Sequence, residues 1–162
     1  MTVIAIDSAG HAGNPPVLML ATKHTSSKGQ SARALRVGPA EHSTYVDCTD
    51  NWREKFTAAL IVRTILPIYG PDHALLIDWD FNVVNRRMRL QDYIRRLLGV
   101  RFYGEPSKTN PKISFSNDSD PDVKRADLKA WLAYHQMGLF SVRAGLFTVR
   151  DAPGLLNDIM SL

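Results

Sequence analysis

Cysteine is nearly absent from this sequence, which holds one residue of that type, Cys48. A single cysteine cannot form an internal disulfide, and no Cys/His cluster has the spacing of a zinc site. A disulfide-built secreted scaffold and a zinc module are therefore excluded, and a reducing, cytoplasmic location is expected. With 162 residues the chain can bury roughly two thirds of its unfolded surface, so it needs neither a disulfide nor a structural metal ion to fold.

Long apolar runs are missing as well. The longest helical apolar stretch, Phe56 to Ile68, is interrupted by Arg63, whereas a bilayer span needs about 20 apolar residues. The N-terminus has no basic region and reaches an acid at Asp7, so it does not have the form of a signal peptide. We expect a soluble protein with no membrane partner.

Glutamate is scarce: thirteen of the sixteen acidic residues are Asp and three are Glu. Asp is short and rigid, so it suits a metal site or a helix cap better than a helix surface. Chance composition explains this bias equally well. The excess of basic residues gives a net charge of +4, which allows a polyanionic partner without requiring one.

The basic residues are concentrated in one segment. Five of the twenty lie between positions 86 and 96, with no acid among them before Asp92: Arg86, Arg87, Arg89, Arg95 and Arg96. Guanidinium groups bind phosphates well, so these arginines are candidates for contact with nucleic acid, and a solvated helix face is the plainer alternative. His11 is a further candidate for contact with the substrate, with a simple turn residue as the alternative.

The first part of the chain predicts an antiparallel meander and a helix. Strands are expected at 2–6, 17–22 and 32–37, joined by short turns. A helix is expected from the cap candidates Thr49 to Asn51 as far as Pro67, with Glu54 placed for a capping-box contact.

The second part alternates strands and helices. The expected elements are a buried parallel strand at 74–77, a helix from Asn82 or Asn85 to Leu98, a fifth strand at 100–103 and a helix from Pro121 to about Met137. A polar loop at 104–117 includes a short extended piece at 113–115. Residues 138–162 form a C-terminal extension with an apolar segment, compatible with an oligomer contact, and a last helix near 153–160.

The order β-β-β-α-β-α-β-α predicts one α/β domain over residues 1–162, with a core at about 2–137. Its mixed five-stranded sheet would carry helices on both faces. Asp7 and Asp78 each follow an apolar strand. If these strands are adjacent and parallel, the two carboxylates meet at one edge of the sheet, where ligands gather. Two close carboxylates repel unless a cation lies between them, and oxygen ligands suit Mg²⁺ or Mn²⁺.

At these residues the sequence resembles a known group. Ile4-Ala5-Ile6-Asp7-Ser8-Ala9-Gly10-His11 is similar to the first-strand motif of the ribonuclease H-like superfamily, in particular the type 2 ribonucleases H and the Holliday-junction resolvases. The segment from Pro121 to Leu128 resembles the last helix of that superfamily, where an Asp supplies a late metal ligand. The element order over about 2–137 agrees with that superfamily.

The resemblance implies a metal-dependent endonuclease, a hydrolase that binds RNA or DNA. Asp7 would bridge two metal ions, and Asp78 and Asp127 would each complete the coordination of one. Asp80 would replace Asp78 as a ligand if Asp80 is the residue that faces the site. In the same way, Asp122 would replace Asp127. The expected substrates are an RNA–DNA hybrid, a branched DNA or a precursor RNA.

The sequence departs from the type 2 pattern after Asp7. Ser8 stands where those enzymes carry Glu, and His11-Ala12 replaces their Arg-Gly, so the motif that senses the ribose 2′-hydroxyl is incomplete. This favours an alternative, a catalytically inactive ribonuclease H-like module that binds nucleic acid or a protein. A phosphotransferase of the actin and sugar-kinase fold shares the Asp-x-x-Gly strand end, but the chain is too short for the two domains of those enzymes.

Overall fold

The computed structural model describes residues 2–11, 14–25, 29–78, 84–116, 138–142 and 145–162. Its first three strands, β1 (Val3–His11), β2 (Asn14–Thr25) and β3 (Gly29–Val37), pair antiparallel in chain order. Consecutive residues of β1 and β2 are buried, and every second one, such as Ile4, Ile6 and Met19, belongs to the core under the helices. The predicted meander is confirmed.

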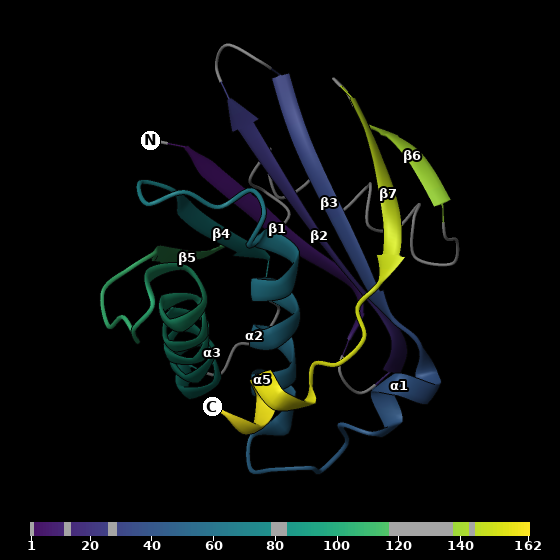
Figure 1. Ribbon diagram of the computed structural model, residues 1–162, viewed down its shortest axis with the longest axis vertical. Helices are drawn as coiled ribbons and strands as arrows, with labels where there is room; N and C mark the ends of the chain where they lie inside the picture. Colours follow the sequence, from purple (N-terminus) through teal and green to yellow (C-terminus); the bar gives the residue numbers. More distant parts are fainter. Residues whose placement is uncertain (1, 12–13, 26–28, 79–83, 117–137, 143–144) are drawn as a thin grey trace.

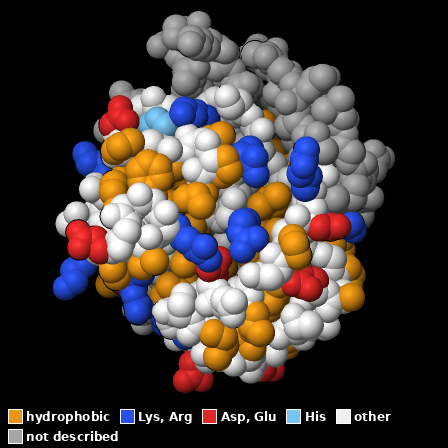
Figure 2. Space-filling model, viewed as in Figure 1, with side chains coloured by type: hydrophobic (Ala, Val, Ile, Leu, Met, Phe, Trp, Pro, Cys, Tyr) orange, Lys and Arg blue, Asp and Glu red, His pale blue; other side chains and the backbone are white. Residues whose placement is uncertain are grey.

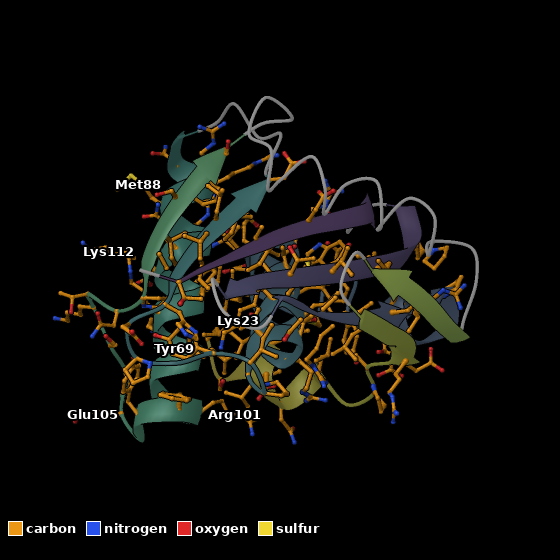
Figure 3. The ribbon with its side chains drawn as sticks, turned by 90° about the horizontal axis from the view of Figure 1, so that it is seen from above. Lys23, Tyr69, Met88, Arg101, Glu105 and Lys112 are labelled. Atoms are coloured by element: carbon orange, nitrogen blue, oxygen red, sulfur yellow. The ribbon has the colours of Figure 1, made fainter. Side chains whose placement is uncertain are left out.

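Two parallel strands extend the sheet on the other side of β1. Strand β4 (Ala74–Asp78) pairs parallel with β1, and β5 (Lys112–Ser116) pairs parallel with β4. Helices α2 (Trp52–Ile65) and α3 (Val84–Leu98) pack together against one face of this sheet (Figures 1 and 3). A short helix α1 (Pro39–Ser43) lies between β3 and α2. The helix predicted at 121–137 lies outside the described residues.

The core lies between the sheet and these helices. Ile4 and Ile6 of β1, Leu75 and Ile77 of β4, and the apolar face of α2 form one buried cluster. Full burial of each such side chain contributes roughly 1.5–3 kcal/mol. This packing determines which residues of each strand face the helices, and it therefore also determines which residues lie on the opposite face.

The fifth strand was predicted in the wrong place. Residues Gly99–Tyr103 continue α3 as a π-helical turn, labelled η1 here, and β5 is the extended piece at Lys112–Ser116. A four-residue apolar run does not distinguish strand from helix, so periodicity could not decide. The helical segment ends at Gly104, whose φ of +83° favours glycine.

The sheet is also larger than the predicted five strands. Strand β7 (Gly145–Asp151) pairs parallel with β3, and β6 (Gly138–Val142) pairs with β7, which gives the order β5-β4-β1-β2-β3-β7-β6. The predicted extension therefore adds its apolar segment to the sheet edge. These pairings join distant parts of the chain, which local patterns do not reveal.

The last helix, α5 (Leu156–Met160), is held against α2 by polar contacts. Tyr45 donates a hydrogen bond to Glu41 and accepts one from the Leu155 N–H at 3.0 Å. Burial and the bond to Glu41 raise the pKa of Tyr45 to about 12, so its hydroxyl stays protonated near neutral pH. Asp158, which is buried, pairs with Arg63 at 3.5 Å and with Arg101.

Gly99→Ala tests the tight turn after α3. A Cβ at Gly99 would lie 2.4 Å from the Ser107 nitrogen and 2.6 Å from the Glu105 oxygen, both backbone atoms. We expect the substitution to lower the free energy of unfolding by about 1–3 kcal/mol, the usual cost of overpacking. Gly38→Ala is the control because a Cβ there meets nothing within 4 Å, and it should cost less than about 1 kcal/mol. Equal urea midpoints for the two variants would contradict this account of the turn.

Candidate functional site

Asp7 and Asp78 occupy neighbouring positions on two adjacent strands. The parallel pairing of β1 with β4 runs from Val3 opposite Ala74 to Ile6 opposite Ile77, and each Asp is the next residue of its strand. Adjacent strands lie about 4.8 Å apart. On the far side of β4, Asp78 is paired with Ser116 of β5. The row Asp7, Asp78, Ser116 therefore crosses three strands.

This row lies on the face of the sheet opposite α2 and α3. Ile6 and Ile77 belong to the core under the helices, and successive strand residues point to opposite faces. Asp7 is opposite Leu20 of β2, which is also buried but is not part of the core under the helices. The candidate acids therefore share one face, away from the helices.

The sequence suggested that the first strand ends at Asp7, but the strand continues beyond this residue. Strand β1 continues to His11 and forms a long hairpin with β2. The parallel pairing of β1 with β4 ends next to Asp7, because Asp78 is the last residue of β4. Asp7 therefore lies where β1 passes the carboxyl end of its parallel neighbour, a place at which α/β sheets bind ligands.

Asp7 is buried, and Asp78 is half-buried. The Asp7 side chain is 4% exposed, and its Oδ1 accepts a hydrogen bond from the Ser8 N–H at 2.8 Å. The Oδ2 atom of Asp7 and the Oδ1 atom of Asp78 are buried as well. Burial and a like charge nearby both disfavour ionised carboxylates, and a divalent cation between them offsets both effects. Two carboxylates with a hydroxyl in the same row form an oxygen donor set that fits Mg²⁺ or Mn²⁺.

The remaining predicted ligands cannot be placed. Asp80, Asp122 and Asp127 lie outside the described residues. Within the described ranges, no group of three or more His, Cys, Asp or Glu side chains is arranged to hold a metal ion. His11 is the last residue of β1 and is paired with Asn14 across the hairpin.

The five arginines predicted to bind nucleic acid lie on α3, and each contacts another part of the protein. Arg89 and Arg86 face Glu54 of α2, with nitrogen to oxygen distances of 2.9 Å and 4.0 Å. Arg87 lies over the Phe115 ring, Arg95 donates to the Pro111 carbonyl at 3.1 Å, and Arg96 pairs with Asp92 at 3.6 Å. These contacts position the guanidinium groups and use part of their donor capacity.

Basic side chains do not form a continuous band on the face seen in Figure 2. There the Lys and Arg side chains lie among apolar patches and a few acidic groups. Lys23 and Arg101, labelled in Figure 3, are on the helix side of the sheet. Lys23 donates to the Ile68 carbonyl at 2.9 Å, and Arg101 pairs with Asp158.

Glu54 has a role that the sequence did not indicate. The expected capping-box geometry is not formed, because the N-cap Asn51 is in the left-handed region with a φ of +55° and makes no side-chain cap bond. Glu54 is instead 6% exposed and joins the first turns of α2 and α3 through Arg86 and Arg89. It also lines a pocket of about 340 Å³ between these helices. Its partners lie far along the chain, so no local pattern could identify them.

One comparison with known proteins gives a match. The structure superposes on a chain of the complex of PCNA with ribonuclease HII from Archaeoglobus fulgidus, with a TM-score of 0.56 and 14% sequence identity. The match covers 83% of this chain and 73% of that chain. The protein has a ribonuclease H-like fold. At this identity the likeness shows the fold alone, and it confirms the fold class predicted from the sequence.

The other comparisons give no match. No family model matches this sequence, and no curated protein does. In the described part of the chain, no helix is long and apolar enough to cross a bilayer.

Arg89→Ala tests the buried ion pair at the pocket. The change leaves the Glu54 carboxylate with only the more distant Arg86, so we expect the free energy of unfolding to fall by about 1–3 kcal/mol. Arg96→Ala, on the same helix, removes an exposed pair with Asp92 and should cost less than about 0.5 kcal/mol. Chemical unfolding of both variants measures the difference, and a loss for Arg89→Ala no larger than that for Arg96→Ala would contradict the role given to Glu54.

Proposed function

We propose that this protein is a divalent-metal-dependent nuclease that cleaves phosphodiester bonds in structured nucleic acid. The observation that carries the proposal is that Asp7 and Asp78 directly follow Ile6 and Ile77, which are paired on the adjacent strands β1 and β4. The ribonuclease H-like fold supports it, since the similar structure contains a ribonuclease HII. A cytoplasmic location is part of the proposal.

Asp7 and Asp78 would hold the metal, with Asp127 as the third ligand. Asp80 is the alternative to Asp78, and Asp122 is the alternative to Asp127. When bound, Mg²⁺ or Mn²⁺ ions supply an activated water and stabilise the leaving oxygen of an in-line displacement. The chain's own contribution is a rigid donor set. The Ser8 N–H orients the Asp7 carboxylate, and the pairing of β1 with β4 fixes the spacing of the two strands that carry the acids.

The substrate would be an RNA–DNA hybrid, a branched DNA or a precursor RNA. The first-strand motif around Asp7 resembles that of the type 2 ribonucleases H, which makes a hybrid the first substrate to test. Ser8 in place of the Glu of type 2 enzymes argues for testing branched and single-stranded substrates in parallel. Arg86, Arg87, Arg89, Arg95 and Arg96 are the proposed basic contacts to nucleic acid, together with His11.

Cleavage of labelled hybrid, branched and single-stranded substrates in Mn²⁺ tests the proposal. We expect the wild-type protein to cleave at least one of them, and Asp7→Asn and Asp78→Asn each to lower the rate at least about 100-fold. Mutations in the outer shell of metal sites already cost 10–100-fold, and a lost ligand should cost more.

Asp72→Asn is the matched control, because Asp72 is an exposed acid before the start of β4, at the opposite end of that strand from Asp78. It should cleave at the wild-type rate. Absence of cleavage by the wild type, or equal rates for wild type and Asp7→Asn, would reject the nuclease. Nucleic-acid binding without cleavage or Mn²⁺ uptake would instead support the inactive module, for which Ser8 is the motivating residue.

A further inference from the structure

A pocket lies between the first turns of α2 and α3 and contains two of the arginines proposed to contact nucleic acid, Arg86 and Arg89. Its volume is about 340 Å³, which is within the range of small-molecule sites. The walls come from the loop before α2, from the first turn of α2 and from the first half of α3. The polar residues that line it are Asp47, Asn51, Arg53, Glu54, Arg86 and Arg89.

The charges in this pocket favour an anion. Three arginines and two acids line it, so one positive charge remains in excess. The Glu54 carboxylate is buried and already engaged by Arg89. Asp47 is exposed, so water screens its charge more strongly than that of a buried group.

The arginines are held in place with donors left over. Arg89 uses its NH2 group on Glu54, while its Nε is a buried donor with no hydrogen-bond partner among the described residues. Arg53 is exposed, and its guanidinium lies 5.6 Å from the centroid of the Trp52 ring. A guanidinium has five N–H donors in a planar fork that matches phosphate oxygens. Fixed guanidinium groups bind an anion with a smaller entropy cost than mobile ones.

The position of the pocket in the fold also favours a ligand. Helix α3 begins after β4, and α2 runs back toward the start of β4, so the first turns of both helices lie at the carboxyl end of that strand (Figure 1). The Asn51 side chain contacts the Tyr93 hydroxyl at 3.4 Å and does not cap α2. The first-turn N–H groups of a helix carry partial positive charge, which adds to that of the arginines.

We propose that this pocket binds the phosphate group of a nucleotide or polynucleotide through Arg53, Arg86 and Arg89. The pocket is on the helix side of the sheet, at the same end of β4 as Asp78, whose side chain points to the opposite face. Glu54 acts as a positioning residue that holds two of the three guanidinium groups. This binding requires no metal ion, so it can be measured apart from cleavage, although it rests on the proposed function for the role of Arg86 and Arg89 as contacts to nucleic acid.

Phosphate binding is tested on the full chain in EDTA, with inorganic phosphate as the probe and the melting temperature as the readout. A ligand that binds only the folded state raises that temperature progressively as its concentration exceeds the Kd. We expect a phosphate-dependent rise for the wild type, and an apparent affinity at least about 10-fold lower for Arg53→Gln and for Arg86→Gln. Lys108→Gln is the control, since it removes the same charge from an exposed position outside the pocket and outside the proposed nucleic-acid contacts, and it should keep the wild-type affinity.

Two outcomes would overturn the site. One is no phosphate-dependent shift in the wild type, and the other is an equal loss of affinity in Lys108→Gln and Arg53→Gln, which would indicate a nonspecific effect of net charge. Arg53→Gln keeps the test decisive if Arg86→Gln fails to fold, because Arg53 is exposed.

A second arm of the same experiment identifies the source of the phosphate. A polynucleotide that binds at least about 10-fold more tightly than a mononucleotide, with the same dependence on Arg53, assigns the pocket to a nucleic-acid backbone. Equal affinities assign it to a free nucleotide. Loss of cleavage in the Asp7→Asn variant with phosphate binding intact would separate this site from the nuclease.

Discussion

The parallel pairing of β4 with β1 is the constraint on which the rest of the structure depends. It sets Ile6 beside Ile77 in the core under α2 and α3. Because strand residues alternate between faces, the same register sets Asp7 and Asp78 side by side on the other face. A one-residue slip would turn the acids toward the helices and the isoleucines toward the opposite face. Hydrophobic packing on one face therefore fixes the spacing of the carboxylates on the other.

The two faces carry different chemistry at one end of the sheet. The face away from the helices holds the buried carboxylate of Asp7 and the half-buried carboxylate of Asp78, and a divalent cation would reduce the repulsion between them. The helix side holds the pocket in which Glu54 fixes Arg86 and Arg89 and which carries excess positive charge. Both lie at the carboxyl end of β4, where the strand ends and α3 begins. A phosphodiester needs partners of both kinds, a metal for the reacting group and guanidinium groups for other phosphates.

The sequence predicts the meander, the fourth strand and the neighbourhood of Asp7 and Asp78, because long apolar strands leave a clear pattern. It misplaces the fifth strand, because Val100 to Tyr103 is too short a run to separate a strand from a π-helical turn. It does not reveal β7 or the ion pairs of Glu54, because their partners lie far along the chain. The positions of Asp80, Asp122 and Asp127 lie outside the described residues, so the third ligand stays a prediction.

The central claim is that Asp7 and Asp78 share a divalent ion. A crystal of the protein soaked in Mn²⁺ and measured for anomalous scattering tests it most directly. The account predicts a peak within about 2–2.5 Å of a carboxylate oxygen of both residues, and its loss in crystals of Asp78→Asn. A peak that touches only one of the two, or no peak at a Mn²⁺ concentration that supports cleavage, would contradict it.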